Sequence, residues 1–455
     1  MAADEDTPSS SQPTLARTMG LGALTVYGVG DMLGAGIYGL MGRAAGLMGN
    51  AVWLAFVMAM SVALLTGLSY ANIGSRYPRA AGAPYVVHRA FRAPFISFLI
   101  GLGVAASGLT SMATGSRVIA GYVQSLGVGL PTGVLAVGFL VLLSLVVFRG
   151  MRESTWMNML CTGVELSGLL IVIGVGVGSW GSVDYFEVPP SETGGLEAGI
   201  TLGLLLQGAV LTFFSFIGFE DILNVAEEVK RPRTTLPLGL LLALLIATTL
   251  YVLVAISAVS VLPYRELGQS KAALVDVVRK AAPSFPPILF TAISIFAVAN
   301  TALLNFVMGS RLLYGMSRQG LLPALLGRVH SGRRTPHVAI FVLLGIVLTL
   351  SLLGDIRQLA DATSLLLLLA FVVVNGALIV LKLRPGEPRG SFEVPVVVPV
   401  LGALVCLVMI VGRVLGAEAD ARAPLIAGGI ITGISVLYVL RRPKHVVVEE
   451  GPEHP

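Results

Sequence analysis

The stretch GDMLGAGIYGL, Gly30 to Leu40, sets an aspartate and a Gly-Ala-Gly triplet in the middle of an apolar segment, Met19–Leu47, that is long enough to cross a membrane. Glycine weakens a helix interior, and an acidic residue at membrane depth costs roughly 2.5–3.5 kcal/mol on insertion scales. Irregular backbone at that depth is tolerated only where protein or a water-filled cavity satisfies it. The stretch therefore predicts a spanning helix that is interrupted at its centre and lines a polar cavity.

The composition is that of a helical membrane protein. The chain has 455 residues, of which 55% are hydrophobic and 12% are charged, whereas soluble domains carry about 25% charged residues. Its 54 glycines would let spanning helices approach closely. The basic residues lie in short connections and do not indicate a nucleic-acid partner. The two cysteines, Cys161 and Cys406, lie in apolar runs and are interpreted as buried thiols, so neither a metal site nor a cofactor is predicted.

Apolar runs predict an all-α integral membrane protein with twelve transmembrane helices. The predicted spans are Met19–Leu47, Ala51–Ile73, Phe95–Leu126, Thr132–Phe148, Met157–Trp180, Gly199–Ala226, Leu236–Leu262, Ile288–Tyr314, Val338–Leu353, Leu359–Leu383, Val394–Leu415 and Leu425–Leu440. Residues 1–18 are expected to be a disordered cytoplasmic tail, residues 19–441 the twelve-helix domain, and residues 442–455 a second cytoplasmic tail.

The charge distribution predicts the orientation. With the N-terminus inside, most of the 30 Lys and Arg residues fall in the inner connections, as the positive-inside rule requires. Both termini are then cytoplasmic in a multi-pass protein of the plasma membrane (the cell inner membrane). The outer connection Pro263–Pro287 has the pattern of an amphipathic helix, which we expect to cover the transport pathway.

A second interruption falls in the sixth predicted span, where Gly218 is followed by Glu220 and Asp221. Interruptions at corresponding positions of two halves indicate the binding site of an inverted-repeat transporter. The N-terminus of a half-helix offers free N–H groups and a positive dipole end to a carboxylate, and unwound carbonyls suit an ammonium. Together these features predict a zwitterionic substrate, an amino acid.

Four motifs in register resemble the amino acid–polyamine–organocation superfamily of permeases. They are GAGIY in the first span, YPRAAGAPYVVHRAF at 77–91, FFSFIGFEDILNVAEEVKRPRTTLP at 213–237, and GSRLLYGMSRQGLLP at 309–323. The resemblance implies the leucine-transporter fold, a 5+5 inverted repeat with broken helices 1 and 6 and two extra helices. It also implies secondary transport by alternating access.

The resemblance also implies the residues of the substrate site. Backbone amides at the first break would hold the carboxylate, carbonyls at both breaks would hold the amino group, and two phenylalanines would act as gates or simply as packing residues. The amides are those of Gly34, Ala35 and Gly36, and the carbonyls are those of Met32, Phe214 and Ile217. Gly218 forms the second break, and the two aromatic gates are Phe214 and Phe216.

The candidates for proton coupling are acidic residues at membrane depth. Glu165 lies in the fifth span, where several proton-coupled members of the family have a lysine, so that mechanism does not transfer unchanged. Glu220 and Asp31 are the other candidates, and Arg117 either pairs with one of these acids or extends to the surface. The eighth span offers Asn300, Thr301 and Asn305 but no pair of hydroxyls, which argues against sodium coupling.

The sequence leaves alternatives to a proton-coupled amino acid transporter. An amino acid exchanger would fit the same pattern. So would a polyamine or organic amine carrier, because Asp31, Glu165, Glu220 and Asp221 could form an acidic pocket for a diamine. A channel or receptor is disfavoured by paired broken helices. An enzyme is not expected, because all five histidines fall in connections or the C-terminal tail.

Overall fold

The computed structural model describes residues 19–78, 82–149, 155–190, 199–318, 322–333, 335–415 and 421–441, without the side chains of residues 82, 155–158, 224, 227, 318 and 441. The two predicted tails, residues 1–18 and 442–455, lie outside the described residues. Regular structure in the described ranges is helical, apart from one isolated parallel bridge between Met19 and Val229.

The helices follow the predicted spans closely, with two of the spans divided. The α-helices are α1 Leu21–Met32, α2 Ala35–Met48, α3 Val52–Arg76, α4 Gly82–Phe91, α5 Pro94–Ser125, α6 Thr132–Arg149, α7 Thr155–Gly176, α8 Leu202–Phe213, α9 Pro232–Val261, α10 Tyr264–Gln269, α11 Ala273–Ala281, α12 Pro287–Arg318, α13 His337–Leu353, α14 Ile356–Leu383, α15 Val397–Leu415 and α16 Arg422–Arg441. The 3₁₀ helices are η1 Gly49–Ala51, η2 Val177–Ser179, η3 Phe214–Phe216, η4 Phe219–Glu228 and η5 Ala324–Gly327.

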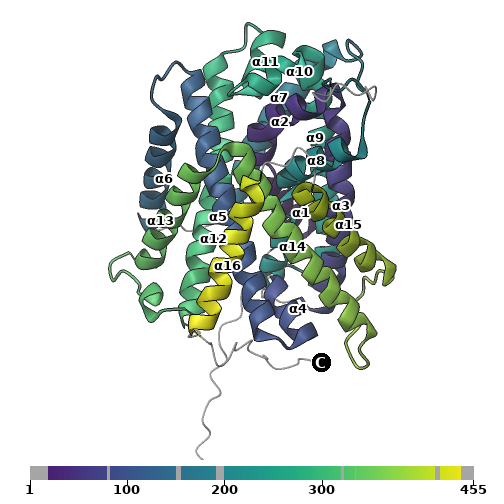
Figure 1. The fold of residues 1–455 in the computed structure, drawn as a ribbon, viewed down its shortest axis with the longest axis vertical. Coiled ribbons are helices and arrows are strands. Elements are labelled where there is room, and N and C mark those ends of the chain that lie inside the picture. Colours follow the sequence, from purple (N-terminus) through teal and green to yellow (C-terminus); the bar gives the residue numbers. More distant parts are fainter. Residues whose placement is uncertain are drawn as a thin grey trace, which may run out of the picture.

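The helices form one bundle whose long members run roughly along the vertical axis of Figure 1. The short helices α10 and α11 lie at one end, called the α10 end below, and α4 lies at the opposite end, the α4 end. In Figure 1, α6 and α13 lie at one flank and α15 at the other, and α1 and α8 lie near mid-height on the side of α15.

The lengths and surfaces of the helices confirm an all-helical membrane protein. In the described part of the chain, ten helical segments are long and apolar enough to cross a membrane, and α13 is a shorter apolar helix. Large apolar side chains are exposed on peripheral helices, for example Leu142 on α6, Leu404 on α15 and Leu425 on α16. Such a surface suits lipid, since the bilayer core is as apolar as these side chains.

Two connections fold differently from the sequence expectation. The connection Pro263–Pro287 forms two short helices, α10 and α11, instead of one. Ser270 accounts for the division, because its hydroxyl accepts from the Ala272 amide (3.0 Å) and donates to Asp276 Oδ2 (2.5 Å). The amphipathic prediction holds for α11, whose apolar side is buried. In addition, α4 forms a helix within the motif Tyr77–Phe91.

An ion-pair cluster ties the α14–α15 connection to the α4 end. Glu393 accepts from Arg76 Nε (2.6 Å) and Arg76 Nη2 (2.7 Å), and from Lys382 Nζ (2.5 Å). A second carboxylate, Glu387, accepts from Arg89 Nε and the Tyr77 hydroxyl, each at 2.8 Å. Partial burial by itself would raise the pKa of Glu393, but the hydrogen bonds from Arg76 and Lys382 lower it to about 2.

We predict that Glu393→Gln lowers the thermal unfolding midpoint of the detergent-purified protein at pH 7. The free energy of unfolding should fall by about 2 kcal/mol, because charge-assisted hydrogen bonds are lost. Because the folded-state pKa lies below the ordinary 4.5, this stabilisation is complete above about pH 4.5 and is lost as the pH falls toward 2. The difference between wild type and variant should shrink over that range. Glu266→Gln, at an exposed position on α10, is the control, and equal midpoints at pH 7 would contradict the assignment.

Candidate functional site

The first predicted interruption is present in the structure. Helix α1 ends at Met32 and α2 begins at Ala35, with Leu33 and Gly34 between them. The first hydrogen bond of α2 runs from the Tyr38 amide to the Gly34 carbonyl (3.1 Å). The amides of Ala35 and the two residues after it therefore have no partner within the helix. This half-helix N-terminus provides backbone donors and a positive dipole end among buried residues of the bundle.

The second interruption is longer and depends on one glycine. Helix α8 ends at Phe213, η3 follows, Ile217 is extended, and η4 begins at Phe219. Gly218 has a φ of 121°, a conformation that only glycine adopts without strain. The position of the break in this span therefore depends on Gly218.

The two breaks contact each other. A Cβ at Gly36 would overlap the Cα of Ser215 in η3, and a Cβ at Gly218 would lie 2.8 Å from the Asp31 carbonyl oxygen. Both glycines are needed because the backbones of the two segments meet there. Gly34 is needed for a third contact, since its Cβ would overlap Thr301 Oγ1 on α12. The structure therefore brings together the residues that the sequence named at both breaks.

Tyr251 on α9 joins the two breaks. Its buried hydroxyl lies 2.7 Å from the Met32 carbonyl oxygen and 2.8 Å from that of Ser215, so it donates to the last carbonyl of α1 or to η3. Sequence analysis missed this residue, because a tyrosine in an apolar span gives no signal of its partner. The bond also engages the Met32 carbonyl, which was expected to face the substrate.

Glu165 and Glu220, both buried, have different surroundings. Glu220 Oε2 accepts from the Gly218 amide (3.0 Å) and so caps the start of η4. Glu165 Oε1 on α7 accepts from Asn300 Nδ2 on α12 (2.9 Å), whereas its Oε2 has no hydrogen-bond partner among the described residues. The Tyr38 hydroxyl on α2 donates to the backbone carbonyl of Glu165 (2.5 Å). Glu165 therefore lies where three helices meet.

Asp31 adds a further acidic group beside the breaks. Its Oδ2 is buried and has no hydrogen-bond partner in the described part of the chain, and it interacts electrostatically with Asp221, Glu220 and Glu165. Arg117 Nε donates to the Ser351 carbonyl (2.5 Å), and no ion pair between Arg117 and these acids is present among the described residues. An acidic group with an unpaired oxygen is suited to bind a proton or a cationic group.

The two candidate aromatic gates differ in their packing. The Phe216 ring is fully buried and lies 5.3 Å from the Tyr251 ring, centroid to centroid, so in this conformation it packs the core. Phe214 is also buried, at 4% exposure, and its carbonyl accepts from the Ile217 amide (3.4 Å). Phe214 stays a predicted gate.

Comparisons with known proteins agree with this geometry. The sequence profile of the amino acid permease family matches residues 20–435. The chain belongs to the amino acid permease family. The permease is 28% identical over 425 residues to the branched-chain amino acid permease BcaP of Bacillus subtilis, covering 88% of the chain and 89% of that protein. It is 30% identical over 406 residues to cationic amino acid transporter 4 of Mus musculus, covering 84% of the chain and 62% of that protein. It is also 29% identical over 423 residues to a methylthioribose transporter of Bacillus subtilis, covering 88% of each chain. The permease is accordingly a membrane transporter and not an enzyme.

We predict that Tyr251→Phe impairs transport and destabilises the fold, because a buried carbonyl at one break loses its donor at a cost of about 1–3 kcal/mol. Tyr70→Phe is the matched control, since Tyr70 is also buried and packs its ring on Phe219 and Phe371. Uptake and the unfolding midpoint should both fall only in Tyr251→Phe. Equal behaviour of the two variants would remove Tyr251 from the site.

Proposed function

We propose that the permease is a secondary active transporter that moves amino acids across the plasma membrane by alternating access. The observation that carries this proposal is the contact between two helix breaks that expose free amides beside buried carboxylates. The printed names of two relatives, a branched-chain amino acid permease and a cationic amino acid transporter, support an amino acid substrate. Another relative is named for a different solute, methylthioribose.

The proposed architecture has twelve spans. The segments α1–α2 and α8–η4 each count as one broken span, and α3, α5, α6, α7, α9, α12, α13, α14, α15 and α16 are the others. The breaks then open the two halves of a 5+5 inverted repeat, with α15 and α16 as the two additional helices. Because basic residues concentrate in the connections at the α4 end, we place that end and both termini in the cytoplasm.

The same geometry suggests how a zwitterion is held. The free amides of Ala35 and Gly36 would donate to the α-carboxylate. The Met32 carbonyl is engaged by Tyr251 and the Phe214 carbonyl by the Ile217 amide, which favours the Ile217 carbonyl as the acceptor for the ammonium. Asp31 would complete the site on the ammonium side.

Glu165 is the proposed site of the coupling proton. One carboxylate oxygen of Glu165 accepts from Asn300 on α12 and the other has no hydrogen-bond partner among the described residues, while its backbone carbonyl accepts from Tyr38 on α2. A change in its protonation would therefore occur beside a broken helix. Glu220 is the weaker candidate, because its carboxylate is used to cap Gly218.

An organic amine carrier is the second candidate, favoured by the acidic groups around Asp31. We predict that L-leucine uptake into proteoliposomes is inhibited by free amino acids but poorly by L-leucine methyl ester or N-acetyl-L-leucine, because each derivative removes one charged group. Liposomes without protein give the background. If cadaverine or spermidine competes better than every amino acid, the amine-carrier function replaces the proposed one.

We predict that Glu165→Gln abolishes the dependence of amino acid accumulation on external pH, because a carboxamide cannot take up or release a proton, while exchange of amino acids continues. Glu220→Gln is the comparison and should keep the dependence on pH. A Glu165→Gln protein with the wild-type pH profile would refute the assignment, and a flat profile in Glu220→Gln alone would move the proton site to η4.

A further inference from the structure

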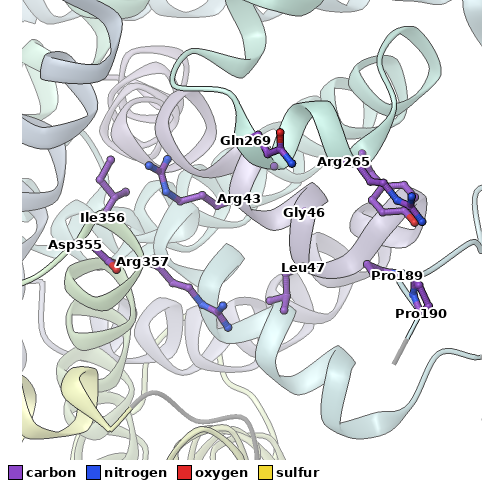
Figure 2. Close-up of a pocket in the computed structure, with 12 residues that line it drawn as sticks. Arg43, Gly46, Leu47, Pro189, Pro190, Arg265, Gln269, Asp355, Ile356 and Arg357 are labelled. Atoms are coloured by element: carbon purple, nitrogen blue, oxygen red, sulfur yellow. The ribbon is translucent and has the colours of Figure 1, made fainter. Parts of the chain in front are cut away.

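A separate cavity of about 700 Å³ lies at the α10 end, between α2, α10, the start of α14 and residues 189–190. Figure 2 shows Arg43, Arg265 and Arg357 projecting around it from three different helices. Among the described residues that line the cavity, the only acid is Asp355. The proposed function places this end outside the cell, so the cavity would be the first part of the permease that an external solute meets.

The arginines are only partly neutralised by their surroundings. The Asp355 carboxylate accepts from the Gln358 amide (2.8 Å) and caps α14. Asp361 lies 4.0 Å from Arg357 Nε but is paired with Arg413 at 2.8 Å. Arg357 Nε is itself buried and has no hydrogen-bond partner in the described part of the chain. Three arginines against one acid give the lining of the cavity an excess of positive charge.

The other two arginines are also available to a solute. Arg43 Nη1 donates to the Gly39 carbonyl (3.2 Å) and interacts electrostatically with Asp355. Arg265 is exposed, lies over the Tyr264 ring at 5.8 Å and interacts electrostatically with Glu187. Guanidinium groups bind carboxylates through paired, charge-assisted hydrogen bonds. A cavity lined in this way attracts carboxylates and repels cations.

Helix α2 links the cavity to the proposed substrate site, because its first residues lie at the break and Arg43, Gly46 and Leu47 line the cavity. Arg43 lies eight positions after Ala35 on α2, which corresponds to about 12 Å along the helix axis. The free amides that would hold the carboxylate thus lie at one end of α2, and the arginines surround its other end.

We propose that the cavity is a docking site for carboxylates and makes the permease select zwitterionic and anionic amino acids over cationic solutes. The proposal rests on the proposed function, and it names the substrate class of that transporter. It separates the permease from an amine carrier, because a polyamine has no carboxylate and meets like charge at the entrance. A zwitterion gains a contact through its carboxylate, whereas lysine and putrescine carry net positive charge.

The test uses the full-length permease in proteoliposomes, with uptake of radiolabelled L-leucine, L-glutamate, L-lysine and putrescine. Wild type should prefer L-leucine or L-glutamate. The double variant Arg265→Gln/Arg357→Gln should raise the KM for the preferred amino acid by roughly three- to tenfold, with an unchanged maximal rate and improved competition by L-lysine. High salt should shrink the difference between wild type and variant, because it screens the exposed guanidinium groups.

Two further variants control the test. Arg279→Gln removes an exposed arginine on α11 that lies outside the cavity and should leave the KM unchanged. Arg265→Lys/Arg357→Lys keeps the charge and should keep the exclusion of L-lysine and putrescine. If the double glutamine variant folds with wild-type KM and selectivity, or if wild type prefers L-lysine or putrescine, the docking site is refuted. If wild type transports none of the four solutes, the proposed function fails and the docking proposal falls with it.

Discussion

The close contact between two interrupted helices is the constraint on which the rest of the structure depends. Gly36 and Gly218 allow the backbones of the two breaks to touch, and Tyr251 bridges their carbonyls. Unpaired backbone groups at membrane depth would otherwise be costly. The contact satisfies several of these groups through protein and leaves the first amides of α2 for a ligand. The proposed substrate site thus consists of backbone amides that have no hydrogen-bond partner within their own helix.

This arrangement joins substrate binding to the surrounding helices. Helix α2 begins at the substrate amides, contacts α7 through Tyr38, and ends among the arginines of the cavity at the α10 end. Helix α12 contacts the break through Thr301 and holds Glu165 through Asn300. A tilt of the first broken helix would therefore disturb both the substrate amides and the environment of Glu165. That geometry provides a physical link between the carried solute and the proton that we propose to drive it.

Sequence reasoning located the breaks and the spans but not the contacts made by side chains. Glycine pairs inside apolar runs reveal where a spanning helix is weak, so Gly34, Gly36 and Gly218 could be named in advance. Tyr251 could not be found, because its role depends on a neighbour that is 219 positions away in the chain. Likewise, the surroundings of Glu165 depend on Asn300, which is 135 positions away in the chain. Long-range pairing of this kind has no local pattern.

The most direct measurement of the central claim is a cryo-electron microscopy structure of the permease in lipid nanodiscs with a saturating transported amino acid. The account predicts density between the two breaks, with the carboxylate at hydrogen-bond distance from the amides of Ala35 and Gly36 and the amino group beside the Ile217 carbonyl. Ligand density elsewhere in the bundle, with these amides bonded to protein groups, would contradict the account.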